Sequence, residues 1–125
     1  MRKTVFISYH FNDKTYKGEV QKWLEEAGSK VISVDENDLR PLGDSFIELN
    51  IRRDVSSSHL VLILVGNDTH NRPWINYEVA VARSKGIPTY WVRLTNRFGA
   101  APVEVRGING IDYTRLEICN LLIKN

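Results

Sequence analysis

Short apolar runs alternate along the chain with longer amphipathic stretches, a pattern typical of strands and helices that alternate around a parallel sheet. Residues 60–65 form a continuous apolar run, as expected for a strand covered on both faces, and so we place this strand at the centre of the sheet. Strands are expected at residues 4–8, 30–34, 60–65 and 89–94, with a short fifth strand near 105–108 inside an otherwise loop-like stretch from 95 to 110.

Four amphipathic segments carry helix signals between these strands. Gly28 and Gly86 are suited to end two of the helices, Pro73 suits a first turn, and Asp44 can cap a helix. The helices are expected at residues 13–27, 44 to about 57, 73–85 and 113–123. Residues 1–125 are therefore expected to form one domain with a flavodoxin-like, three-layer α/β fold: a doubly wound parallel sheet of about five strands. Such sheets bind ligands at the carboxyl ends of their strands.

Composition and charge argue against several classes of partner and site. The 17 basic and 15 acidic residues leave a net charge of +2 and are interspersed, which gives little reason to expect nucleic-acid binding. The longest apolar run, residues 60–65, is far shorter than the roughly 20 residues of a membrane-spanning helix, so no membrane partner is expected. A lone cysteine, Cys119, excludes an internal disulfide and a cysteine-rich zinc site, and the start lacks a signal-peptide core. A cytoplasmic location is expected.

Several familiar chemistries lack their motifs. The chain has no G-x-x-x-x-G-K-[ST] loop, no G-x-G-x-x-G turn and no G-x-S-x-G elbow. Gly66 stands where a phosphate-accepting receiver domain would need an aspartate after its central strand. The three histidines lack the spacing of a helical zinc site, and no metal is expected.

One acidic residue interrupts an apolar helix face. The face follows helical spacing through Trp74, Ile75, Glu78, Val79 and Ala82. Because burial of an unpaired carboxylate is unfavourable, Glu78 should be paired, lie at a rim or face a cleft. The spacing alone favours a structural role, with Glu78 paired to Arg72 or Arg83 or simply solvated.

A catalytic role is the alternative. Trp74, one turn earlier on the same face, offers a flat apolar wall beside the charge of Glu78. Cleavage of an N-glycosidic bond passes through a ribosyl cation that a fixed carboxylate can stabilise. Nicotinamide leaves as a neutral molecule, so one acidic group suffices for that reaction.

Three segments together resemble Toll/interleukin-1 receptor (TIR) domains. They are T-V-F-I-S-Y-H at residues 4–10 with Asp13 shortly after, Asp35 followed by Leu39 and G-D-S-F at residues 43–46, and W-I-N-Y-E-V at residues 74–79. The last resembles the W-x-x-x-E helix start of bacterial, NAD-cleaving TIR domains. G-N-D-T at residues 66–69 looks closer to the stand-alone TIR-like proteins of bacterial Thoeris antiphage systems, which convert NAD to a cyclic ADP-ribose signal for a separate effector.

The resemblance implies an enzyme that cleaves the nicotinamide N-glycosidic bond of NAD and releases nicotinamide with ADP-ribose or a cyclic ADP-ribose isomer. NAD would be the substrate, and no cofactor is implied. By the same resemblance, Glu78 takes the place of the catalytic glutamate and Trp74 lies near the ribose. The remaining substrate-binding residues implied are Ser8, Tyr9 and His10 in the first turn, and Arg40 and Gly43 in a loop that covers the site or contacts a neighbouring domain.

The family also implies partners: self-association through TIR surfaces, an activating phage component and a downstream effector that reads the product. Two other functions remain open from the sequence. One is a non-catalytic TIR-like adaptor that acts only through its surface. The other is an enzyme like the nucleoside deoxyribosyltransferases, which are also flavodoxin-like and use a glutamate nucleophile.

Overall fold

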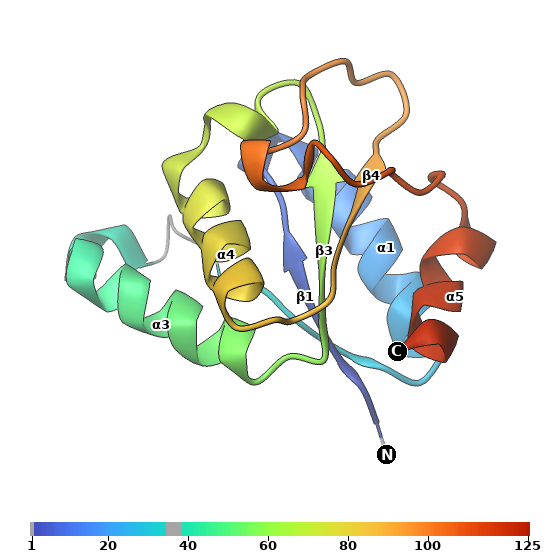
Figure 1. The fold of residues 1–125 in the computed structure, drawn as a ribbon, viewed down its shortest axis with the longest axis horizontal. Coiled ribbons are helices and arrows are strands. Elements are labelled where there is room, and N and C mark those ends of the chain that lie inside the picture. Colours follow the sequence, from blue (N-terminus) through green and yellow to red (C-terminus); the bar gives the residue numbers. More distant parts are fainter. Residues whose placement is uncertain (1, 35–38) are drawn as a thin grey trace.

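A computed structural model describes residues 2–34 and 39–125. Its centre is a parallel sheet in the order β2-β1-β3-β4 (Figure 1). The strands span β1 Thr4–Ser8, β2 Lys30–Ile32, β3 Leu60–Val65 and β4 Thr89–Arg93. The predicted α/β class and the predicted central position of β3 are confirmed, and β2 is shorter than the predicted strand.

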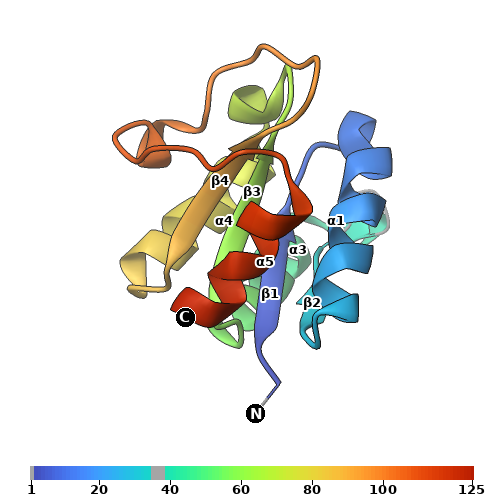
Figure 2. The same cartoon turned by 90° about the vertical axis from the view of Figure 1, so that its right-hand side faces the viewer.

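Helices cover both faces of the sheet, which makes the fold three-layered and doubly wound (Figure 2). The helices are α1 Lys14–Glu26, α3 Asp44–Ser56, α4 Pro73–Ser84 and α5 Arg115–Lys124. Helices α3 and α4 pack on one face, and α1 and α5 pack on the other. None of the helices within residues 2–34 and 39–125 is long and apolar enough to cross a membrane.

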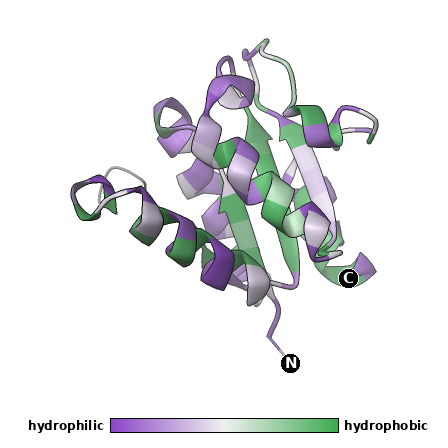
Figure 3. Ribbon diagram, turned by 60° about the vertical axis from the view of Figure 1, so that its left-hand side comes forward, coloured by the Kyte–Doolittle hydropathy of each residue, from purple (hydrophilic) through white to green (hydrophobic). Residues whose placement is uncertain are grey.

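Strand β3 supplies both cores. All six of its residues are buried. Because successive side chains of a strand point to opposite faces, Val61, Ile63 and Val65 join the core under α3 and α4. Leu60, Leu62 and Leu64 join the core under α1 and α5. Figure 3 shows hydrophobic residues in the inner strands, between helices in which hydrophilic and hydrophobic residues alternate.

The start of α3 differs from the sequence expectation. Gly43, not Asp44, is the residue that precedes the helix, and it makes no side-chain cap. Its φ of 89° lies in the left-handed region that glycine tolerates. This conformation turns the chain from the short 3-10 helix Arg40–Leu42 directly into α3, so Asp44 falls inside the first turn.

The expected fifth strand near residues 105–108 does not form. Instead, a 3-10 helix at Val103–Val105 buries Val105 in the core under α4, and the chain then crosses Trp91 of β4. The Trp91 indole donates a hydrogen bond to the carbonyl of Ile108 at 2.7 Å, and only Ile111 forms a bridge to β4, opposite Val92. The described sheet therefore has four strands, because this indole holds the following segment over the edge strand.

Gly110 lies directly on the Trp91 ring: a β-carbon there would come within 2.8 Å of ring atoms. We expect Gly110→Ala to lower the free energy of unfolding by about 1–3 kcal/mol through overpacking. Gly107→Ala is the matched control, because nothing lies within 4 Å of its β-carbon position, and its stability should be unchanged or slightly raised. Urea denaturation measures both variants. Equal stability of the two would contradict the packing over Trp91.

Candidate active site

The carboxyl ends of β1 and β3 form the topological switch point of the sheet. The chain leaves β1 toward α1 on one face and leaves β3 toward α4 on the other. Doubly wound sheets bind ligands at this position, because the diverging loops leave a crevice between them. A ligand site at this position would be built from side chains at the end of β1, from Ser8 onward, and from those that follow Val65.

Ser8 and Glu78 meet at this point from different elements. Ser8 ends β1 with its side chain turned toward α4, and Glu78 lies on the second turn of α4. The Ser8 hydroxyl donates a long hydrogen bond of 3.5 Å to Oε1 of Glu78. Ser8 is fully buried and Glu78 is only 5% exposed. The expectation of a simply solvated Glu78 is thus wrong, and the carboxylate is held inside the protein beside a hydroxyl.

The position of α4 is fixed by a buried threonine. The Thr69 hydroxyl accepts a hydrogen bond from the Gly66 backbone N–H at 2.8 Å and donates one to the Leu64 carbonyl at 3.2 Å. Thr69 opens the short 3-10 helix Thr69–Asn71, and the Asn76 amide of α4 donates to the carbonyl of His70 in that helix at 3.1 Å. These bonds tie the first turns of α4, and with them Glu78, to the end of β3.

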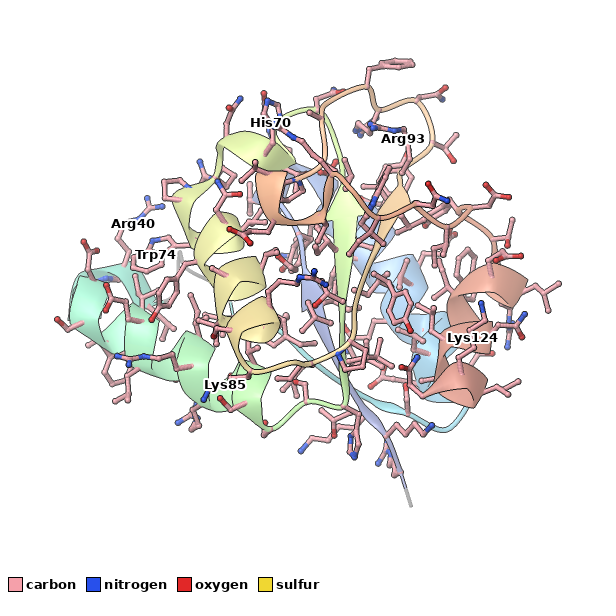
Figure 4. The ribbon with its side chains drawn as sticks, in the orientation of Figure 1. Arg40, His70, Trp74, Lys85, Arg93 and Lys124 are labelled. Carbon is pink, nitrogen blue, oxygen red and sulfur yellow. The ribbon has the colours of Figure 1, made fainter. Side chains whose placement is uncertain are left out.

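Trp74 lies in the first turn of α4, four residues before Glu78. It is half-buried, packs on the core under α3 and α4, and contacts Tyr77 edge to face, with 6.0 Å between ring centroids. Arg40 and Gly43 are exposed at the entry to α3. Figure 4 places Arg40 and Trp74 on the side of the molecule where α3 faces α4. Asp35, part of the TIR resemblance, lies outside the described residues.

The other two residues expected in the first turn lie apart from Glu78. Tyr9 packs on the core under α1 and α5, the opposite face of the sheet from Ser8, and the Lys17 ammonium lies 5.7 Å from its ring centroid. His10 is half-buried and caps the 3-10 helix Phe11–Asp13, where its Nδ1 accepts the Asn12 N–H at 2.9 Å. Strand alternation places Ser8 and Tyr9 on opposite faces of the sheet, and of these three first-turn residues it is Ser8 that donates a hydrogen bond to Glu78.

A second buried carboxylate lies at the same edge of the sheet. Asp13 is 2% exposed, and its Oδ1 accepts a hydrogen bond from Nε of Arg97 in the loop after β4 at 3.2 Å. Its carboxyl group fills the space beside Gly66, where any β-carbon would overlap Oδ2. Sequence reasoning did not pair these residues. The available signal was an aspartate after β1 and a glycine after β3, at the neighbouring ends of two adjacent strands.

Comparison with solved structures defines the class of the fold. The structure is similar to the TIR domain of the Toll-related receptor TRR-2 from Hydra magnipapillata, with a TM-score of 0.73 and 19% sequence identity over 96% of this chain and 94% of that one. The fold is therefore that of a TIR domain. Among residues 2–34 and 39–125, no three His, Cys, Asp or Glu side chains gather as a metal-binding group.

The family follows from the sequence match. The profile of the family described as "Thoeris protein ThsB, TIR-like domain" matches residues 6–97, which include Ser8, Gly66 and Glu78. The chain belongs to this family. It is also 23% identical, over 90% of its length, to a Bacillus cereus (strain MSX-D12) protein named "Putative cyclic ADP-D-ribose synthase ThsB1". The chain spans 63% of the length of that relative.

We expect Gly66→Ala to lower the free energy of unfolding by about 3 kcal/mol, because the new methyl group must displace the buried Asp13 carboxylate. The same change made in an Asp13→Ala background should cost less than about 1 kcal/mol, since the space is then free. Denaturant unfolding of the four proteins in this double-mutant cycle gives the coupling.

Gly18→Ala in α1 serves as the control, because open space surrounds that position and alanine favours a helix. Additive costs for Gly66→Ala and Asp13→Ala would show that backbone strain at Gly66, and not contact with Asp13, causes the loss.

Proposed function

We propose that this chain cleaves the nicotinamide N-glycosidic bond of NAD, with Glu78 as the catalytic carboxylate. The observation that carries the proposal is the burial of Glu78 at the carboxyl edge of the sheet, where its Oε1 accepts the Ser8 hydroxyl. Burial at a ligand-binding edge is costly for a carboxylate and is common at functional sites. Membership of the ThsB TIR-like family and the name of the Bacillus cereus relative agree with this chemistry.

Burial makes the Glu78 carboxylate a strong partner for a cation. As the bond between C1′ of the ribose and the nicotinamide nitrogen breaks, positive charge develops on the ribose and the electron pair leaves with neutral nicotinamide. A carboxylate held in a water-poor site stabilises that charge without having to reorganise. Ser8 keeps Oε1 in place through its hydroxyl. Trp74, at the rim one turn away, offers an apolar wall for the ribose or the departing ring.

The ribosyl cation has two possible fates. Attack by water forms a C1′–O bond, releases a proton and gives ADP-ribose. Attack by an atom of the same dinucleotide gives a cyclic ADP-ribose isomer instead, and this outcome requires that water be kept out. We propose the cyclic product, by analogy with the named relative. From the TIR resemblance of the sequence we further propose that this product is an antiphage signal, with a cytoplasmic location, self-association through TIR surfaces, an activating phage component and an effector that reads the product.

The two alternative functions have less support from the structure. An outward-facing Glu78 would have favoured a purely adaptor-like domain, and Glu78 is buried instead. Nothing in the described residues specifically favours a deoxyribosyl transfer.

Replacement of Glu78 by glutamine should reduce nicotinamide release from NAD at least about 100-fold, because the amide keeps the shape but lacks the negative charge. Glu25→Gln, which alters an exposed acid on α1, is the control and should retain wild-type activity. Purified proteins are incubated with NAD over a range of concentrations, alone and with extract of phage-infected cells. Chromatography measures nicotinamide, and mass spectrometry separates linear from cyclic product.

Equal release by wild type and Glu78→Gln would reject the role of Glu78. Absence of release from the wild type under every condition, with the fold intact, would favour the adaptor.

A further inference from the structure

The loop after β4, residues 95–101, exposes a large aromatic ring at the carboxyl edge of the sheet. The loop rises above the ends of β3 and β4 before it descends to the 3-10 helix at Val103–Val105 (Figure 1). Phe98, in this loop, is 85% exposed, more than any other large hydrophobic residue in the described part of the chain. The loop therefore carries an apolar ring into solvent at the edge where Glu78 lies.

The backbone around Phe98 is held on both sides. Its N–H donates to Oδ1 of Asn67 at 2.8 Å. The next residue, Gly99, lies so close to the loop after β3 that a β-carbon would overlap the Asn67 carbonyl, and the Gly99 carbonyl accepts a hydrogen bond from Arg93. The backbone is thus held at Phe98 itself and at the next residue, Gly99.

The first half of the loop is anchored as well. Tyr16 of α1 donates its hydroxyl to the Thr95 carbonyl at 2.7 Å. The Arg97 guanidinium lies 5.1 Å from the Tyr16 ring centroid and makes the ion pair with buried Asp13. Asn96 adopts a left-handed φ of 59°, which turns the chain between these anchors. The Phe98 ring is consequently exposed on a loop whose backbone is held at several points.

Exposure of a phenyl ring to water is unfavourable. A loop whose backbone is already held loses little conformational entropy when a partner stacks on its exposed ring, which favours such a contact. Planar nucleobases stack on such rings through their π faces.

The register of the sheet gives the distance between the site at Ser8 and the start of this loop after Arg93. Ser8 pairs with Ile63, and Arg93 pairs with Val65 on the next strand. With about 3.3 Å per residue and about 4.8 Å between strands, the backbones of Ser8 and Arg93 lie roughly 12 Å apart. A separation of this order suits the two ends of a dinucleotide and is too long for one nucleoside. Arg93, labelled in Figure 4, ends β4 at the root of the loop, where its guanidinium donates to the Gly99 carbonyl and lies 5.7 Å from the Trp91 ring centroid.

We infer that Phe98 stacks on the adenine ring of the dinucleotide whose ribosyl bond is cleaved at Glu78. The inference rests on the proposed function and adds a residue that selects the adenine half of the substrate. The diphosphate then crosses the edge of the sheet near Arg93, and the nicotinamide ribose reaches Ser8 and Glu78.

Two substrates with the same scissile bond test this inference. NAD carries the adenine half and nicotinamide mononucleotide lacks it. Phe98→Ala should raise KM for NAD about fivefold to tenfold with kcat nearly unchanged, and should leave KM for nicotinamide mononucleotide unaltered. Phe98→Tyr should restore KM for NAD, whereas Phe98→Leu, equally apolar but without a π face, should not. Gly99→Ala, which must displace the loop, should raise KM for NAD while Phe98 is still present.

Ile123→Ala is the matched control, because Ile123 is 83% exposed on α5 and is remote in sequence from the loop. Its KM for both substrates should equal that of the wild type. Thermal melts of all variants confirm folding. Equal effects of Phe98→Ala on the two substrates, or full rescue by Phe98→Leu, would overturn adenine stacking.

Binding of AMP and ADP-ribose, measured by calorimetry, separates failure of this inference from failure of the proposed function. If the wild type binds AMP more tightly than Phe98→Ala does but cleaves no NAD, the stacking role stands and the proposed activity fails. If NAD is cleaved but AMP binds the two proteins equally, or binds neither, the stacking role is wrong.

Discussion

The packing of a buried charge against a glycine sets the arrangement of the loops at the carboxyl edge of this domain. Asp13 enters from the turn after β1, fills the space beside Gly66 at the end of β3, and is neutralised by Arg97 from the loop after β4. A carboxylate this deeply buried requires such a partner. Three loops that are distant in sequence are therefore joined through one side chain.

Two buried carboxylates lie at one edge of the sheet. Asp13, on the side of α1, accepts a hydrogen bond from Arg97, and Glu78, on the side of α4, accepts one from the hydroxyl of Ser8. Its helix is held to the end of β3 by Thr69, whose buried hydroxyl uses both its donor and its acceptor capacity. The first contact joins the loops at this edge, and the second holds the Glu78 carboxylate beside the end of β1.

Sequence patterns predicted most of the fold, because the strong signals were local. The continuous apolar run of β3 and the glycines after α1 and α4 specified elements that the structure contains. The expected fifth strand was wrong because a tertiary hydrogen bond from Trp91 overrode the local pattern. At the site, helical spacing singled out Glu78 and Trp74, but spacing could not tell a solvated glutamate from a buried one. The contact of Asp13 with Gly66 joins residues 53 positions apart, and no periodicity reports such a contact.

The absence of room at Gly66 also has an evolutionary consequence. A relative that acquires a side chain at this position must give up the carboxylate at position 13 or move it, and the arginine at position 97 would then lose its counter-charge. The three positions should therefore be inherited as a set. In an alignment of relatives, divergence at one of them would mark a lineage whose loops have settled into a different arrangement.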